Sequence, residues 1–245
     1  MLTLAIETAT VNCSVALLHG DRVLAEESLA VPRVHSVVLM PMIAQLYQRV
    51  CAIPQETDLV AVSCGPGSFT GLRIGIATAK GLAYAWNKPC VAVGTLDGLA
   101  MQGGGLRSVR TVLAVLKARQ GELYYCLFRP SSGIPQKIGE VSAGYPEDIA
   151  EAVHEAAVRE APVLLVGDVD LAEGETLVEV LAGRGIPCAV APAWLRRPRA
   201  AIIGILGRLL AENGLKTDAA RLSAAYVRKS EAEIKWEKSR PASRK

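Results

Sequence analysis

Short apolar runs alternate with longer apolar patterns of helical length along this chain, and this alternation is typical of an α/β protein. The first three runs, at residues 2–6, 13–18 and 23–29, are separated by polar turns and predict an antiparallel meander. We expect further strands at residues 58–63, 90–93, 109–116, 122–128, 134–141 and 163–166, and helices at residues 33–51, 68–86, 95–101, 147–159, 171–183 and 198–213.

The pattern breaks at residues 102–105, which read Gln-Gly-Gly-Gly, and the runs that follow repeat the opening hairpin around a turn at residues 118–121. Two lobes of similar plan are therefore expected. We predict an N-terminal lobe at residues 1–102, a C-terminal lobe at residues 103–221 and an extended basic tail at residues 222–245.

The first predicted helix, residues 33–51, carries apolar side chains around most of its circumference. A helix that covers one face of its own sheet needs only a narrower apolar stripe, so we expect something besides that sheet to cover this helix. Pro41 lies inside the pattern and predicts a kink or a local break.

The second predicted helix has small residues at every fourth position, namely Gly71, Gly75, Ala79 and Ala83. Such a face lets another helix backbone approach closely. The two helices can pack on each other inside one monomer, but the excess apolar width of the first favours an additional partner chain. We therefore expect Gly75→Leu or Ala79→Glu to abolish a complex with that partner and to leave the monomer folded.

Between a predicted strand and this second helix, the chain reads Cys-Gly-Pro-Gly-Ser-Phe-Thr-Gly over residues 64–71. Two glycines allow a tight turn, and a serine hydroxyl can cap the helix, so backbone N–H groups would point at one spot near the positive end of a helix dipole. This turn is a candidate phosphate site formed by Gly65, Gly67, Ser68 and Thr70. It lacks the Gly-Lys-Ser/Thr ending of a Walker A loop, and the alternative is that its glycines only allow close packing.

Composition narrows the class of protein. The 245 residues are 51% hydrophobic, which can bury a large core, and no apolar run approaches the roughly 20 residues of a membrane span. We therefore expect a cytoplasmic protein without membrane contact. Six cysteines are scattered without a Cys-x-x-Cys pair, which predicts reduced thiols in the core.

Positive charge gathers at two places. The net charge is +3, and residues 228–245 hold seven Lys or Arg against three Glu, so this end carries +4 and the remainder −1. Residues 196–199, Arg-Arg-Pro-Arg, form a second basic cluster. Both can contact the phosphates of a nucleic acid, or serve only solubility.

The sequence offers little for metal or nucleophilic catalysis. His19, His35 and His154 lie far apart, no His-x-x-x-His occurs, and no Gly-x-Ser-x-Gly elbow is present. We expect no catalytic residue and no metal site in this chain.

Several motifs together resemble one family. They are Glu-Thr-Ala-Thr at residues 7–10, Cys-Ser-Val-Ala-Leu at 13–17, His-Ser at 35–36, Gly-Pro-Gly-Ser-Phe-Thr-Gly-Leu-Arg-Ile-Gly at 65–75, Ala-Arg-Gln-Gly-Glu-Leu-Tyr at 118–124, Tyr-Val-Arg-Lys at 226–229 and Lys-Trp at 235–236. This combination resembles the TsaB (YeaZ) family, the bacterial dimerisation subunit of the tRNA threonylcarbamoyladenosine machinery. The resemblance touches both lobes.

The resemblance implies a two-lobed α/β fold of the actin, hexokinase and Hsp70 type, related to ribonuclease H, with a mixed β-sheet and flanking helices in each lobe. It implies a non-catalytic partner of a TsaD-like paralogue, which transfers threonylcarbamoyl to N6 of adenosine 37 in tRNAs reading codons that begin with A. We further expect a TsaE-like ATPase as a second partner, and tRNA bound through the complex. ATP or ADP can bind at the subunit interface, but the chain itself requires no cofactor. Without the partner, we expect a homodimer.

The resemblance also assigns candidate contacts. For the paralogue they are His35, Val38, Leu39, Met42, Leu46, Gly71, Leu72, Gly75, Ala79, Leu82 and Ala83. The two basic clusters, taken with this role, make Arg196, Arg228 and Lys229 the candidate tRNA contacts.

Two positions depart from the family pattern. Glu7 stands where the family usually has Asp, and Lys117 replaces an Asp that commonly precedes Ala-Arg. A nucleotide–metal site that needs those carboxylates would be compromised, whereas a scaffold role would not. The alternative from another class is an ATP-dependent phosphoryl or carbamoyl transferase acting alone, which would need a metal-holding carboxylate pair. A free-standing RNA-binding module would need a basic groove.

Overall fold

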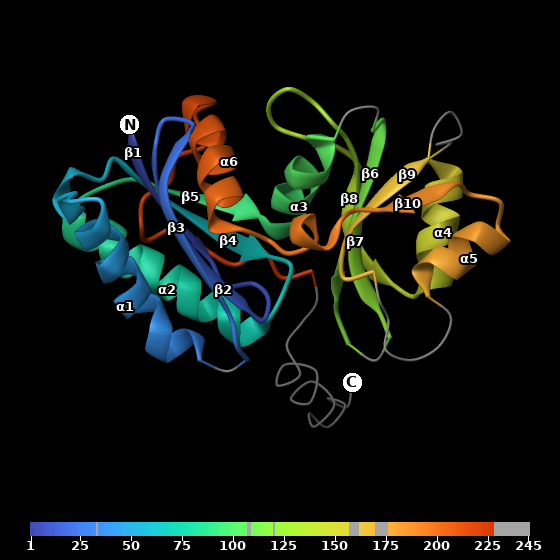
Figure 1. Ribbon diagram of the computed structural model, residues 1–245, viewed down its shortest axis with the longest axis horizontal. Helices are drawn as coiled ribbons and strands as arrows, with labels where there is room; N and C mark the ends of the chain where they lie inside the picture. Colours follow the sequence, from blue (N-terminus) through green and yellow to red (C-terminus); the bar gives the residue numbers. More distant parts are fainter. Residues whose placement is uncertain (33, 107–108, 120, 157–161, 170–175, 228–245) are drawn as a thin grey trace, which may run out of the picture.

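The computed structural model describes residues 1–32, 34–106, 109–119, 121–156, 162–169 and 176–227. Within these ranges the chain forms two lobes that lie side by side, each built on a five-stranded sheet with helices on both faces (Figure 1). The expected α/β fold with two mixed sheets is confirmed.

The first sheet has the strand order β3-β2-β1-β4-β5. The predicted meander is confirmed, because β1 (Leu2–Glu7), β2 (Asn12–His19) and β3 (Arg22–Ala30) pair antiparallel. On the other side of β1, β4 (Leu59–Gly65) and β5 (Cys90–Gly94) pair parallel. The central strands β1 and β4 are buried almost throughout, as expected for strands covered on both faces.

The second sheet repeats this plan with the order β10-β9-β6-β7-β8. Its meander is β6 (Thr111–Lys117), β7 (Leu123–Arg129) and β8 (Gln136–Gly144), and its parallel strands are β9 (Val163–Gly167) and β10 (Cys188–Val190). The three-residue strand β10 was not predicted, because so short a run carries no periodicity.

Helices cover both faces of each sheet. On the first sheet, α1 (His35–Arg49) and α2 (Phe69–Trp86) lie on one face, and α6 (Ala200–Glu212) lies on the other. On the second sheet, α4 (Pro146–Glu155) and α5 (Leu177–Gly183) lie opposite α3 (Thr95–Gly104). Among the described residues, no helix has both the length and the apolar character needed to cross a membrane.

Helix α6 shows where the predicted lobe boundary differs from the packing. The prediction assigned this helix to a C-terminal lobe ending at residue 221, whereas α6 packs against β1, β2 and β4 of the first sheet. Ile203 and Leu206 are buried there, and a Cβ at Gly207 would lie 2.5 Å from the Cβ of Ala61. The apolar period of a helix reveals that one face is buried, but not which sheet buries it.

The glycine run at residues 102–105 is also not a loose border. Helix α3 continues through Gln102 to Gly104 and packs on β6 and β9 of the second sheet. A Cβ at Gly103 would lie 2.5 Å from Cγ2 of Val166, so the missing side chain allows close packing there. Helix α3 also contacts β4, β5 and α6, so it packs against elements of both lobes.

After α6 the chain returns along the first lobe as a strap, residues 217–226. Cys90 and Thr217 exchange two backbone hydrogen bonds of 2.9 Å, and the Ala225 amide donates to the Cys64 carbonyl at 2.8 Å. Leu222, only 1% exposed, belongs to the core between the first sheet and α1 and α2. The predicted tail at 222–245 therefore begins as part of the first lobe; most of it lies outside the described residues.

Candidate functional site

The glycine-rich turn joins β4 to α2. Gly65 has a φ of +119°, which favours glycine, and the Ser68 hydroxyl accepts a 3.2 Å hydrogen bond from the Gly71 amide. The predicted helix cap is therefore confirmed.

Two segments of the same chain press against this turn. The Ser68 amide donates to the Ala9 carbonyl at 2.6 Å, and a Cβ at Gly67 would lie well under 3.0 Å from that carbonyl. On the other side, a Cβ at Gly65 would lie 2.8 Å from the carbonyl oxygen of Ala225. A phosphate site at Gly65, Gly67, Ser68 and the exposed Thr70 stays a prediction, and it requires a ligand to fit beside these two segments.

Glu7 lies at the end of β1, next to the turn, and its carboxyl group is fully buried. Its Oε1 accepts a 2.6 Å hydrogen bond from the Ala9 amide, whereas its buried Oε2 has no hydrogen-bond partner among the described residues. Burial raises the pKa of Glu7 to about 7, and hydrogen bonding from the Ala9 amide and the Ser63 side chain offsets this only in part. This carboxyl group is therefore not a fixed anion at neutral pH.

Lys117, the second departure from the family pattern, lies at the exposed end of β6 in the other lobe. Its backbone amide donates to Oδ2 of Asp168 at 2.9 Å.

Among the residues that the structure describes, no group of three or more His, Cys, Asp or Glu is placed to hold a metal ion.

The predicted partner-binding residues face mostly inward. Val38 and Leu82 are half-buried, and the others are buried in the first lobe, namely His35, Leu39, Met42, Leu46, Gly71, Leu72, Gly75, Ala79 and Ala83. A Cβ at Gly71 or at Gly75 would collide with Thr8, with its carbonyl oxygen or its Oγ1 respectively. The small-residue face of α2 thus receives the β1–β2 turn, not another chain.

This packing corrects one expectation. Gly75→Leu and Ala79→Glu would place bulk or charge inside the first lobe, so a folded monomer is not the expected outcome. The small residues at every fourth position were correctly identified as a close-approach face, but the approaching element is the chain's own turn.

The opposite side of the same two helices is exposed and apolar. On α1, Val37 is 72% exposed and Met40 49%. On α2, Tyr84 is 84% exposed, and a Cβ at Gly81 would meet none of the described residues within 4 Å. We define the outer face by its exposed members Val37, Met40, Pro41, Ala44, Ala77, Gly81 and Tyr84.

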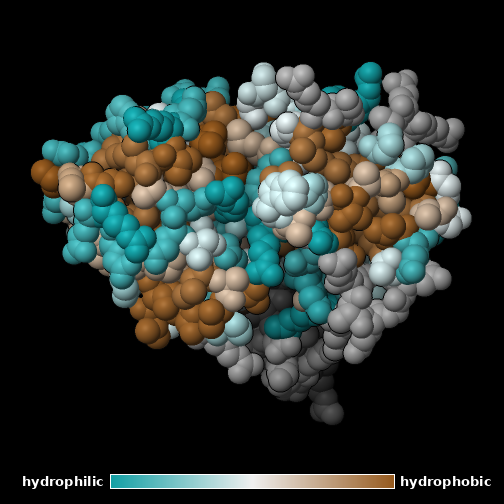
Figure 2. Space-filling view, in the orientation of Figure 1, coloured by the Kyte–Doolittle hydropathy of each residue, from teal (hydrophilic) through white to brown (hydrophobic). Residues whose placement is uncertain are grey.

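Figure 2 shows hydrophobic atoms gathered at the lower left of the molecule, where Figure 1 places α1. The α1 members of the outer face follow the i, i+3, i+4, i+7 spacing of one helical face. The partner-binding residues predicted from the sequence lie mainly on the side of these helices that meets the sheet, because α1 is apolar on both sides and the apolar period alone does not say which side meets the sheet. The partner surface itself stays a prediction.

The candidate tRNA contacts are only partly described. Arg196 is half-buried in the segment that precedes α6, while Arg228 and Lys229 lie outside the described residues. Arg197, which follows Arg196 in the same basic cluster, is exposed.

Comparisons with known proteins agree with the motif resemblance. The family model described as "TsaD: tRNA N6-adenosine threonylcarbamoyltransferase" matches residues 29–236. The chain is 30% identical over 236 residues to the tRNA threonylcarbamoyladenosine biosynthesis protein TsaB of Bacillus subtilis, which covers 96% of this chain and 98% of the relative. It is 38% identical over 135 residues to TsaB of Escherichia coli, covering 55% of this chain and 58% of that protein.

Solved structures support the same assignment. YeaZ from Pseudomonas aeruginosa superposes with a TM-score of 0.75 at 28% identity, covering 92% of this chain and 99% of that one. The ROK hexokinase from Thermus thermophilus, with a TM-score of 0.55 at 12% identity over 87% of this chain and 100% of that one, shares the fold alone. Both the motifs and the whole-chain match point one way: the chain belongs to the TsaB (YeaZ) family of tRNA threonylcarbamoyladenosine biosynthesis proteins.

Proposed function

We propose that this chain is a non-catalytic subunit in the formation of N6-threonylcarbamoyladenosine at position 37 of tRNA, and that it binds and activates a TsaD-like catalytic paralogue through the outer face of α1 and α2. The observation that carries the proposal is the exposed apolar outer face, with Val37, Met40 and Tyr84 projecting from two neighbouring helices. We further propose that it works in the cytoplasm, together with a TsaE-like ATPase.

The outer face has the properties of a helix-packing interface. Its seven members include no charged residue, and depletion of charge with exposed aromatic and Met side chains is typical of interface cores. Ala77 and Gly81 lie one turn apart on α2, so a helix of a partner can approach the backbone there. In the absence of the paralogue, the same face would pair with a second copy of this chain, because exposed apolar surface favours being covered.

The two departures from the family pattern and the packing of the glycine-rich turn support a non-catalytic role. Glu7 is buried with its pKa raised to about 7, and Lys117 brings a positive charge where a metal-binding carboxylate would be needed. The turn itself is packed against Ala9 and Ala225 of the same chain. A site for ATP or ADP at the interface would therefore need binding groups from the paralogue as well as from this chain.

Gly81→Leu tests the interface directly. A Cβ at this position meets nothing within 4 Å in the described part of the chain, so the monomer should stay folded while the leucine obstructs an approaching helix. Gly183→Leu is the matched control, because Gly183 lies in α5 of the other lobe and is equally unobstructed.

Each variant is mixed with the catalytic paralogue from the same organism, and complex size is followed by light scattering alongside threonylcarbamoylation of tRNA with all components present. We expect Gly81→Leu to lose the complex and the activity, and Gly183→Leu to keep both. Unchanged association of Gly81→Leu would refute the proposed face. ATP turnover by this chain alone would instead favour the independent transferase.

A further inference from the structure

The segment between β10 and α6, residues 191–199, connects the two lobes a second time, beside α3. It contains a short 3-10 turn, Ala193–Leu195, and the basic cluster that follows it. Trp194 in this turn is 72% exposed, although tryptophan side chains are usually largely buried. We call residues 191–199 the connector.

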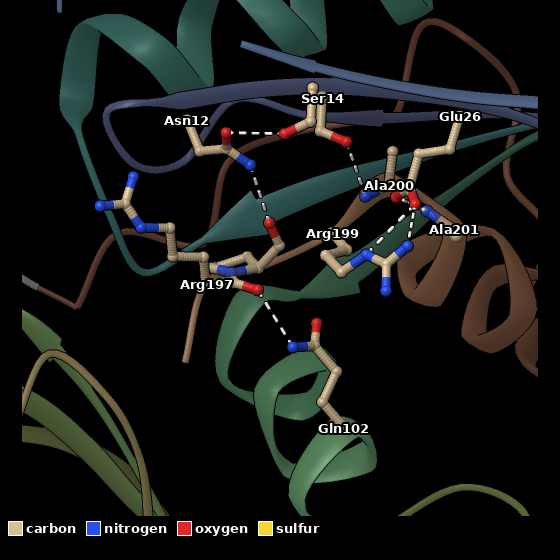
Figure 3. Close-up of polar contacts among 10 residues, drawn as sticks. Asn12, Ser14, Glu26, Gln102, Arg197, Arg199, Ala200 and Ala201 are labelled. Atoms are coloured by element: carbon tan, nitrogen blue, oxygen red, sulfur yellow. Dashed lines mark hydrogen bonds and ion pairs between the residues drawn. The ribbon is translucent and has the colours of Figure 1, made fainter. Parts of the chain in front are cut away.

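Buried side chains hold the backbone of the connector in place (Figure 3). The amide nitrogen of Gln102, a buried residue of α3, donates to the carbonyl of Leu195 at 2.9 Å. The same nitrogen donates to the carbonyl of Arg197 at 3.0 Å, the bond that Figure 3 shows. From β2, Nδ2 of Asn12 donates to the Pro198 carbonyl at 3.1 Å. Three carbonyls of one short segment are thus bonded by two elements that lie far away in the sequence.

The end of the connector is tied to the first lobe by a second group of contacts. Glu26 of β3 forms an ion pair with Arg199, and its Oε1 accepts a 3.0 Å bond from the Ala201 amide. Oγ of Ser14 accepts a 3.2 Å bond from the Ala200 amide. Arg199 is therefore paired with an acidic side chain of the same chain, and this ion pair helps to fix the start of α6.

Arg197 differs from Arg199 in this respect. Its carbonyl is held by Gln102, but its guanidinium points away from these contacts in Figure 3, and no acidic side chain in the described part of the chain pairs with it. The contacts therefore fix the backbone on both sides of Trp194 and Arg197 while leaving the two side chains in solvent. Such preorganisation lowers the conformational entropy lost on binding.

We propose that the connector is an RNA-contacting surface, in which the Trp194 ring stacks on an unpaired base and the Arg197 guanidinium contacts a phosphate. This inference rests on the proposed function, because tRNA is the RNA that such a complex would hold. Unpaired bases stack on aromatic side chains, and arginine neutralises phosphate. Arg197 is exposed, and its cationic guanidinium is complementary to the charge of a polyanion.

The test uses the complete complex with the catalytic paralogue and an unmodified tRNA transcript, with affinity measured at several KCl concentrations. Trp194→Ala should weaken binding about tenfold without changing the salt dependence, whereas Trp194→Phe should keep most of the affinity because it keeps an aromatic ring. Arg197→Ala should lower the slope of log affinity against log salt by about one. Arg184→Ala, which removes an exposed arginine from the second lobe, is the matched control and should change neither.

Unchanged tRNA affinity and salt slope in both Trp194→Ala and Arg197→Ala would overturn the inference while leaving the proposed function standing. Loss of a protein component from these complexes with tRNA affinity retained would also overturn it, because the surface would then bind protein. Failure of the proposed function is distinguishable, since the wild-type chain would then fail to join the paralogue or would be dispensable for modification.

Discussion

The buried carboxyl group of Glu7 should make the stability of this protein depend on pH in an unusual direction. Burial raises its folded pKa to about 7, from the usual 4.5 of the unfolded chain. Between these two values the folded state holds a proton that the unfolded state has released. The stability that depends on this proton is therefore fully present below pH 4.5 and is lost as the pH rises through 7.

The two pKa values set the magnitude. At 1.36 kcal/mol per pH unit, they correspond to a loss of about 3 kcal/mol in the free energy of unfolding, of which about 2.5 kcal/mol falls between pH 5 and pH 8. Glu7→Gln removes this titration and keeps a side-chain oxygen that can accept the bond from the Ala9 amide. Relative to wild type, the variant should therefore gain about 2.5 kcal/mol on going from pH 5 to pH 8.

Urea unfolding followed by circular dichroism at a series of pH values measures this difference. All other groups titrate in both proteins, so their contributions cancel in the comparison. Glu56→Gln is the control, because it removes a carboxyl group at an exposed position. If the difference between Glu7→Gln and wild type were constant from pH 5 to pH 8, the reasoning about burial would be refuted.

Three further predictions follow from packing. Gly75→Ala should lower the free energy of unfolding by about 1–3 kcal/mol, because its Cβ collides with Thr8, whereas Gly81→Ala should raise it by up to about 1 kcal/mol; urea unfolding separates the two. Leu222→Ala should cost about 2–5 kcal/mol in the same assay, since the strap carries a core residue. Cys51 should react fastest with a thiol reagent at pH 8, because it is exposed, while burial raises the pKa of three other thiols to about 11.

Sequence reasoning succeeded where the signal is local. The meander of β1, β2 and β3 follows from alternating runs and polar turns, and the start of α2 follows from Ser68, whose hydroxyl caps the helix. Both features depend on residues within a few positions of one another. The family could also be identified, because its motifs are distinctive strings of residues.

The same reasoning failed where the answer depends on contacts between distant segments. The apolar face of α6 is evident in the sequence, but only the structure shows that it crosses back to the first sheet. The roles of Gln102 and Asn12 could not be predicted either, because each donates a hydrogen bond to a residue at least 93 positions away. Their side chains alone give no sign of which backbone they hold.

The glycines Gly71 and Gly75 of the motif and the outer face occupy opposite sides of α2. One side of the helix therefore serves its packing inside the lobe, and the other is available for association. Gly71 and Gly75 let α2 lie against Thr8, so the motif that identifies the family sets the position of the helix. Gly81 and Tyr84 project from that helix into solvent. A substitution at Gly75 should therefore lower stability and disturb association together, whereas Gly81→Leu should disturb association without lowering stability. If both variants lost the paralogue with unchanged unfolding curves, the motif itself would have to be the contact surface.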